Sequence, residues 1–312
     1  MNPSIAFLFP GQGSQTVGMG RELSEKHAIA KQTFEEADQA LGMKLSQLCF
    51  EGPEEQLRLT EFAQPAILTV SVATWRVLAE HGIQAGFVAG HSLGEYSAHV
   101  AVGTLSFADA VRAVSKRGKY MQEAVPVGVG AMAAVLGMEA DKVRQVCADA
   151  AQGEVCDPAN INSPEQLVIS GHKAAVERAI ALATERGAKK AISLPVSAPF
   201  HCSLMQPAQD RLEKDLSALA FQHPAVPVIC NVDAVAVTDA EASRDALVRQ
   251  VTAAVRWDES IRSLVAKRVE TFVEVGPGKV LWGLMRSIVR SKTALQTSDE
   301  TALEKTIAAL CS

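Results

Sequence analysis

Short apolar runs alternate with helix-length amphipathic stretches along most of the chain. Residues 5–9 read Ile-Ala-Phe-Leu-Phe, a run without polar residues that is typical of a buried parallel strand. Similar runs predict strands ending at residue 89, over 226–232, over 271–275 and near Leu295. Helical periodicity and capping signals predict helices from Pro65 to just before Gly82, from Ser106 through Met121, over 204–219, 246–254 and 257–266, after 276–278, and from Glu300. This alternation predicts an α/β fold with a mostly parallel sheet.

The pattern changes between residues 129 and 197. Here the predicted order is strand, helix, strand, strand, helix, strand, over 131–136, 141–151, 154–160, 167–171, 174–186 and 190–196, with a turn at Asn162-Ser163-Pro164. This order matches the split βαβ, ferredoxin-like motif. We therefore expect a small ferredoxin-like domain at 129–197, inserted into a large α/β-hydrolase-like domain of residues 1–128 and 198–312, with 126–128 and 197–199 as hinges.

One pentapeptide, Gly-His-Ser-Leu-Gly at residues 90–94, carries the strongest chemical signal. It matches the G-x-S-x-G nucleophile elbow, a sharp strand-to-helix turn that projects a serine hydroxyl from a strained backbone position. The glycines remove Cβ atoms that would clash in such a turn. Ser92 is therefore a candidate nucleophile, with a plain strand-to-helix turn between two permissive glycines as the alternative.

A serine needs partners for acyl chemistry, and two segments offer them. Residues 10–15, Pro-Gly-Gln-Gly-Ser-Gln, follow the first strand and place backbone amides where open α/β sheets bind ligands. His201 follows a proline-constrained loop, and an imidazole is the base best suited to activate Ser92 near neutral pH. An ordinary βα turn and a solvent-facing or helix-capping histidine are the alternatives.

Arg117 lies at the edge of the apolar stripe in the helix that Ser106 opens. If its guanidinium is partly desolvated, it needs an anionic partner. The alternative is that the arginine lays its stem on the core and extends its charge into water.

Composition restricts the class of protein. The 312 residues are 48% hydrophobic, and a formal charge of −5 leaves no basic footprint for nucleic acid. Six cysteines without C-x-x-C or Cys/His spacing predict reduced thiols, and neither a metal nor a disulfide is expected. The first residues lack a basic segment, and we expect no apolar stretch to approach the roughly 18 residues of a membrane span. These features predict a cytoplasmic protein.

The motifs occur together, in the same order, in a known family. Over essentially its whole length the chain resembles the malonyl-CoA:acyl-carrier-protein transacylases of bacterial fatty-acid synthesis, which are related to polyketide-synthase acyltransferase domains. The resemblance rests on residues 9–15, 90–97, the helix of Arg117, and residues 162–164, 197–201, 250–251 with 255–257, and 274–278. Each motif is short, but their order is highly specific.

The resemblance implies a ping-pong cycle in which Ser92 accepts the malonyl group as an ester and His201 is the general base. It also implies that a backbone carbonyl near Gln250 orients the histidine in place of a carboxylate. Asp233 and Asp258 stay open as carboxylates that assist His201.

The resemblance assigns four further residues to substrate binding. The backbone amides of Gln12 and Leu93 are expected to form the oxyanion hole, and Arg117 to bind the malonyl carboxylate through two hydrogen bonds. Phe200 is expected to narrow the acyl pocket, because relatives that take methylmalonyl groups tend to carry a smaller residue there.

The expected partners are malonyl-CoA and an acyl carrier protein, with no cofactor, and the chain is expected to be a monomer. Supply of fatty-acid synthesis is the first expectation. A trans-acting polyketide acyltransferase or the acyltransferase subunit of a malonate decarboxylase would share the same site. A serine esterase or thioesterase would share the elbow but would be expected to carry an acid between its serine and histidine. A non-catalytic acyl-carrier or scaffold subunit is disfavoured by the intact Ser92, His201 and Arg117.

Overall fold

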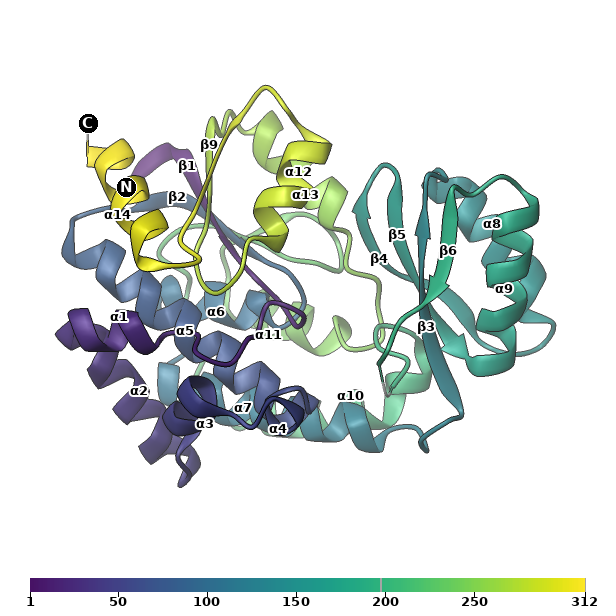
Figure 1. The fold of residues 1–312 in the computed structure, drawn as a ribbon, viewed down its shortest axis with the longest axis horizontal. Coiled ribbons are helices and arrows are strands. Elements are labelled where there is room, and N and C mark those ends of the chain that lie inside the picture. Colours follow the sequence, from purple (N-terminus) through teal and green to yellow (C-terminus); the bar gives the residue numbers. More distant parts are fainter. Residues whose placement is uncertain (197, 312) are drawn as a thin grey trace.

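The computed structural model describes residues 1–196 and 198–311 and contains two separate sheets, each with its own helices (Figure 1). The larger sheet has the strand order β10-β9-β1-β2-β7-β8. Its strands are β1 (Asn2–Phe9), β2 (Ala85–Gly90), β7 (Val228–Ile229), β8 (Ala236–Val237), β9 (Thr271–Glu274) and β10 (Thr293–Gln296). All neighbours are parallel except β7 and β8, which confirms the predicted α/β class with a mostly parallel sheet.

Helices cover both faces of this sheet. They are α1 (Arg21–Lys26), α2 (Ala28–Leu41), α3 (Leu45–Glu51), α4 (Glu54–Leu57), α5 (Thr60–Glu80), α6 (Gly94–Ala101), α7 (Phe107–Glu123), α10 (Gln206–Ser217) with a short 3₁₀ turn (Ser203–Met205), α11 (Ala240–Arg249), α12 (Trp257–Ala266), α13 (Val280–Ile288) and α14 (Glu300–Cys311). Successive residues of β1 enter different cores: Phe7 and Phe9 join the core of α5 and α7, and Leu8 joins that of α12 and α13. The apolar run of β1 is therefore buried on both sides.

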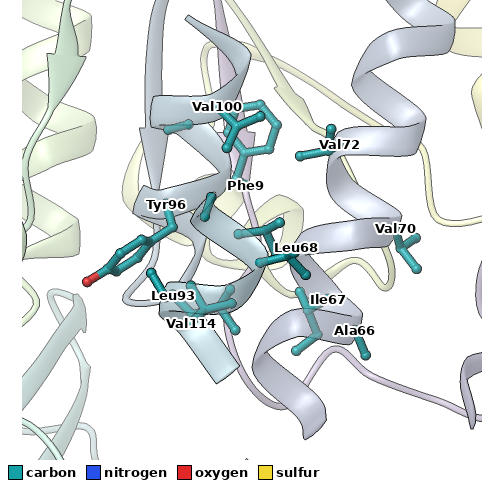
Figure 2. Packing of buried hydrophobic residues seen from close by; sticks show 14 of the residues in the cluster. Phe9, Ala66, Ile67, Leu68, Val70, Val72, Leu93, Tyr96, Val100 and Val114 are labelled. Atoms are coloured by element: carbon teal, nitrogen blue, oxygen red, sulfur yellow. The ribbon is translucent and has the colours of Figure 1, made fainter. Parts of the chain in front are cut away.

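The side chain at the end of β1 shows how the core supports the region after β2. Figure 2 shows Phe9 beside Val100 of α6 and facing Leu68 and Val72 of α5. Phe9 is fully buried, and burying such a ring contributes about 1.5–3 kcal/mol. The packing holds α6 against β1 and fixes where the chain leaves β2.

Two predictions about α5 are wrong. The helix begins at Thr60, so Pro65 lies inside it rather than in its first turn. The proline removes one helical hydrogen bond, and burial of nearly the whole helix offsets that loss. The expectation that no apolar stretch approaches the length of a membrane span is also wrong, because α5 is long and apolar enough to cross a membrane by length and composition. However, 78% of its most apolar window is buried inside the protein. It is the central helix of the core, which explains its composition.

The smaller sheet is antiparallel, in the order β4-β5-β3-β6. Its elements are β3 (Gly130–Leu136), α8 (Ala140–Ala151), β4 (Cys156–Ser163), β5 (Gln166–His172), α9 (Lys173–Glu185) and β6 (Lys190–Ser193), in the order predicted. The predicted turn at 162–164 is too long, because Asn162 and Ser163 continue β4 and Ser163 pairs with Gln166. Residue 197, the predicted limit of this unit and part of a hinge, and residue 312 lie outside the described residues.

Element boundaries after residue 220 also differ from the predictions. The strand predicted at 226–232 contains only Val228–Ile229, and β8 was not predicted. The helix predicted at 246–254 is α11, which begins at Ala240 because the Asp239 carboxylate accepts hydrogen bonds from the amides of Glu241 and Ala242. α11 ends at Arg249, which leaves the carbonyl of Gln250 outside the helix and free to bind a side chain.

The cysteines have the arrangement expected of reduced thiols. All six are free, and they comprise the buried Cys49, Cys147, Cys156, Cys202 and Cys230 and the exposed Cys311. In the described part of the chain no three His, Cys, Asp or Glu side chains come together as a metal-binding group.

Candidate active site

The turn between β2 and α6 has the geometry of a nucleophile elbow. Ser92 has φ +52°, a left-handed conformation that is costly for a non-glycine residue. A Cβ added to Gly90 would lie 1.9 Å from the carbonyl carbon of Gly94, and one added to Gly94 would lie 2.1 Å from the carbonyl oxygen of Phe9. Neither distance is possible for a side chain, so both glycines of the motif are required.

The structure brings the predicted nucleophile and base together. Ser92 Oγ lies 2.8 Å from His201 Nε2, although the two residues are 109 positions apart. His201 Nδ1 lies 3.0 Å from the carbonyl oxygen of Gln250, which therefore accepts the Nδ1 proton. Nε2 is left as the acceptor that faces the serine hydroxyl.

Among residues 1–196 and 198–311, no carboxylate forms a hydrogen bond with His201. Of the two carboxylates left open by the sequence, Asp233 is paired with Arg249 at 2.8 Å and Asp258 with Arg262 at 2.8 Å. Burial and, to a lesser extent, the nearby charge of Arg117 together lower the pKa of His201 to about 3. The imidazole is therefore neutral at physiological pH and can accept a proton from Ser92.

Arg117 is buried beside the nucleophile, with only 1% of its surface exposed. The alternative of an arginine that reaches into water is therefore wrong. Its Nη2 donates to Ser92 Oγ at 3.1 Å and to Gln250 Oε1 at 2.9 Å, and its Nη1 donates to Gln64 Oε1 at 2.8 Å. All three acceptors are neutral, so a positive charge lies at the site without a carboxylate from the described residues bonded to it.

These groups line a cleft of about 510 Å³ between the two sheets. The larger unit contributes Gly11, Gln12, Gly13, Gln15, Arg58, Gln64, His91, Ser92, Arg117, Met121, Phe200, His201, Val280, Leu281 and Leu284, and the smaller sheet and the segment after it contribute Met132, Asn160, Asn162, Gln166, Val168, Leu194, Pro195 and Val196. Phe200 is 9% exposed and faces this space next to His201. Its position is consistent with a side chain that limits the size of a bound group.

The loop after β1 and the elbow lie against each other. The amide of His91 donates to the carbonyl of Phe9 at 3.0 Å, which ties the elbow to the end of β1. In the part of the chain that the structure describes, the amides of Gln12 and Leu93 donate to no backbone or side-chain acceptor. Both amides are therefore available as donors, which is one condition for an oxyanion hole, and Gln12 lines the cleft while Leu93 follows Ser92 directly.

Comparison with protein families gives a match to the acyl transferase domain over residues 6–307. The chain belongs to the acyl transferase family.

Relatives within this family align along nearly the whole chain. The malonyl CoA-acyl carrier protein transacylase of Escherichia coli O157:H7 is 52% identical over 300 residues, which cover 96% of this chain and 97% of the relative. The crystal structure of an acyl carrier protein S-malonyltransferase from Vibrio cholerae has a TM-score of 0.95 at 50% identity, covering 97% of this chain and 99% of that one. A malonyl-transacylase in complex with its type II polyketide synthase acyl-carrier protein has a TM-score of 0.96 at 45% identity, covering 98% and 99%.

Sequence reasoning missed three polar residues in the site of this acyl transferase. Gln64 holds Arg117, and Glu95 and Asn231 lie beneath the elbow, where burial raises the pKa of Glu95 to about 7. Asn231 follows β7 at the carboxyl end of a parallel strand, a position that is itself a signal for function. Gln64 offers no such signal, because it is a single polar residue within an apolar helix.

Proposed function

We propose that this acyl transferase moves the malonyl group of malonyl-CoA to the phosphopantetheine thiol of an acyl carrier protein, through an ester on Ser92. One observation carries the proposal: Ser92 Oγ lies within hydrogen-bonding distance of both the base His201 and the buried cation Arg117. The relatives described above are malonyl transacylases at 45–52% identity, and they supply the identity of the donor and the acceptor.

In the first half-reaction the neutral His201 takes the proton of Ser92 through Nε2, and Oγ attacks the thioester carbonyl carbon. The amides of Gln12 and Leu93 stabilise the negative oxygen of the tetrahedral intermediate; removal of one such donor costs about 10²–10³ in rate. The carbon–sulfur bond then breaks, and the proton on His201 passes to the leaving thiolate of CoA. The Gln250 carbonyl keeps Nδ1 protonated and stabilises the imidazolium that forms.

In the second half-reaction the thiol of the carrier protein enters the same cleft. His201 takes its proton, the sulfur attacks the ester carbonyl, and the proton returns to Ser92 as the carbon–oxygen bond breaks. The cycle is therefore ping-pong, with one acyl-enzyme and no cofactor.

Arg117 selects the acyl group. A malonyl carboxylate presents two oxygens to the planar guanidinium, and the neutral acceptors that hold Arg117 leave its charge for this anion. Phe200 beside His201 disfavours the extra methyl of a methylmalonyl group. A simple esterase or thioesterase would gain nothing from a buried cation at its nucleophile.

Fatty-acid synthesis is the pathway we propose for the product. A second candidate, supply of a polyketide synthase, is favoured by the relative that is bound to a type II polyketide synthase carrier protein. The same site would also serve the acyltransferase subunit of a malonate decarboxylase.

We further propose the finer description of the fold and the cellular setting. The sheet order β4-β5-β3-β6 supports a ferredoxin-like domain at 129–197, inserted into an α/β-hydrolase-like domain of residues 1–128 and 198–312. The charge of −5 supports a protein that does not bind nucleic acid, and we propose a cytoplasmic monomer that does not bind membranes.

The test is transfer of labelled malonyl from CoA to carrier proteins of fatty-acid and polyketide synthesis, with acetyl-CoA and methylmalonyl-CoA in parallel. We expect a malonyl ester on the intact protein, its loss in Ser92→Ala, and transfer that is fastest for malonyl. Release of free malonate without loading of any carrier would point to a hydrolase, and an unmodified wild-type protein would point to a non-catalytic subunit.

A further inference from the structure

A buried carboxylate lies directly beneath the nucleophile elbow. Glu95 is the second residue of α6 and is fully buried. Its Oε2 accepts hydrogen bonds from the backbone amide of Asn231 at 3.0 Å and from Nε2 of Gln250 at 2.8 Å. Its Oε1 has no partner among the described residues. The reaction derived above assigns no role to this carboxylate.

The hydrogen bond from the Asn231 amide connects Glu95 to Ser92. Asn231 is fully buried, its Oδ1 accepts from the amide of Ser92 at 2.7 Å, and its Nδ2 donates to the carbonyl of Gly90 at 2.6 Å. Asn231 therefore holds the backbone on both sides of His91. Ser92 keeps its left-handed conformation only if surrounding contacts impose it, and Asn231 supplies two of them.

The hydrogen bond from Gln250 Nε2 connects Glu95 to the base His201 and to the cation Arg117. Gln250 donates through Nε2 to Glu95 and to the carbonyl of Ser92 at 2.9 Å. Because these two groups only accept, they turn the amide so that its Oε1 faces Arg117, which donates to it. The backbone carbonyl of the same residue accepts from His201. A displaced Gln250 would therefore move both His201 and Arg117.

We propose that Glu95 is a positioning residue. The two hydrogen bonds accepted by its Oε2 hold Ser92, His201 and Arg117 in the relative positions that the reaction requires. The charges of Glu95 and Arg117 interact electrostatically, but the two side chains are connected by hydrogen bonds only through the Gln250 amide, so we assign the positioning to the hydrogen bonds and test the charge separately. The choice of malonyl and acetyl donors in the test below rests on the proposed function.

Two conservative variants separate hydrogen bonding from charge. In Glu95→Gln the amide oxygen can take the place of Oε2 and accept both bonds, while the charge is lost. In Glu95→Asp the charge stays, but the carboxylate is one methylene shorter and withdraws from both donors. Ser97→Ala is the matched control, since Ser97 lies in the same helix, is fully buried, and has a hydroxyl without a partner among the described residues.

The measurements are kcat and KM for malonyl and acetyl transfer, with circular dichroism melting to establish that each variant is folded. We expect Glu95→Gln to stay within about fivefold of wild type, Ser97→Ala to match it, and Glu95→Asp to lose at least 30-fold in kcat for both acyl groups. In Glu95→Asp, KM should rise for malonyl-CoA alone, because only malonyl uses Arg117. A Glu95→Asp variant as active as Glu95→Gln, or more active, overturns the proposal.

A serine-reactive fluorophosphonate makes this test independent of the acyl donor. It bonds to Ser92 Oγ with loss of fluoride and reports how well the elbow and His201 activate the hydroxyl. If malonyl-CoA fails to acylate the wild type, the proposed function fails, yet slower fluorophosphonate labelling of Glu95→Asp than of Glu95→Gln still supports the positioning role. Equal labelling rates of the two variants contradict it.

Discussion

At the scale of single residues, the charge on Arg117 dominates the site. The guanidinium is withdrawn from water, and burial lowers its pKa, yet its direct acceptors are the neutral oxygens of Gln64, Gln250 and Ser92. An anionic acyl group completes the set of partners that a buried cation requires. In the proposed reaction, Arg117 therefore selects the acyl group directly beside Ser92 Oγ, the atom that attacks it.

Replacement of Arg117 by Ala should lower malonyl transfer about 10²-fold or more, because a buried charge pair with a carboxylate is lost. Acetyl transfer should change far less, since the acetyl group carries no carboxylate. Arg117→Lys should lie between the two, because a lysine keeps the charge but not the two parallel hydrogen bonds. The measurement is kcat/KM for both acyl-CoA donors. Equal losses for the two donors in Arg117→Ala would contradict a carboxylate-binding role.

At the scale of elements, the site depends on how closely α6 approaches β1. The first residue of α6 is Gly94, and its backbone lies against the carbonyl of Phe9 at the end of β1. The same contact places Gly94 against Pro10, the first residue of the loop that contains Gln12. The oxyanion hole proposed for Gln12 and Leu93 would therefore depend on the packing between one helix and one strand.

Substitution of Gly94 by Ala should displace α6 from β1, since the new methyl would lie 2.1 Å from a backbone oxygen that has no room to move. We expect a lower melting temperature and a loss of Ser92 acylation of about 10²-fold or more. Gly283→Ala in α13 is the matched control, because a methyl there meets no atom within 4 Å. It should stabilise the protein by about 0.4–1 kcal/mol and leave acylation unchanged. A Gly94→Ala enzyme with normal acylation would show that the close approach is unnecessary.

At the scale of the whole molecule, buried histidines make stability depend on pH. His99 in α6 is fully buried with no partner for either ring nitrogen among the described residues, and burial lowers its pKa to about 3. An unfolded chain would protonate the same ring near pH 6.5. The unfolded state therefore binds more protons below that pH, and stability is lost as the pH falls from about 6.5 toward 3.

Replacement of His99 by Leu should make the melting temperature less sensitive to acid. One fewer proton is taken up on unfolding, which removes up to about 1.4 kcal/mol per pH unit from the slope of stability against pH. Thermal melts of wild type and variant between pH 7 and pH 4.5 measure this slope. Buried carboxyl groups such as Glu274, whose pKa burial raises to about 7, act in the opposite direction but are common to both proteins. Equal slopes of melting temperature against pH in the wild type and the variant would show that His99 is not held neutral in the folded state.

The sequence by itself determined the features that local chemistry encodes. The apolar run of β1 predicted a strand buried on both faces, and Gly90 predicted the elbow, because hydrophobic periodicity and the clash of a Cβ at Gly90 with Gly94 act within a few residues. The predicted boundaries were wrong where contacts with distant parts of the chain decide them. Burial in the core allows α5 to continue through Pro65, and the strand predicted at 226–232 contains only two residues.

Only the tertiary structure decided which groups meet at the serine. The order of parallel strands places Ser92, at the end of β2, beside Asn231, at the end of β7, and the end of α11 brings Gln250 to His201. No local pattern carries these pairings, since they depend on how separate elements pack. The burial of Arg117 has the same origin, and it is the basis for our proposal that this arginine binds a carboxylate.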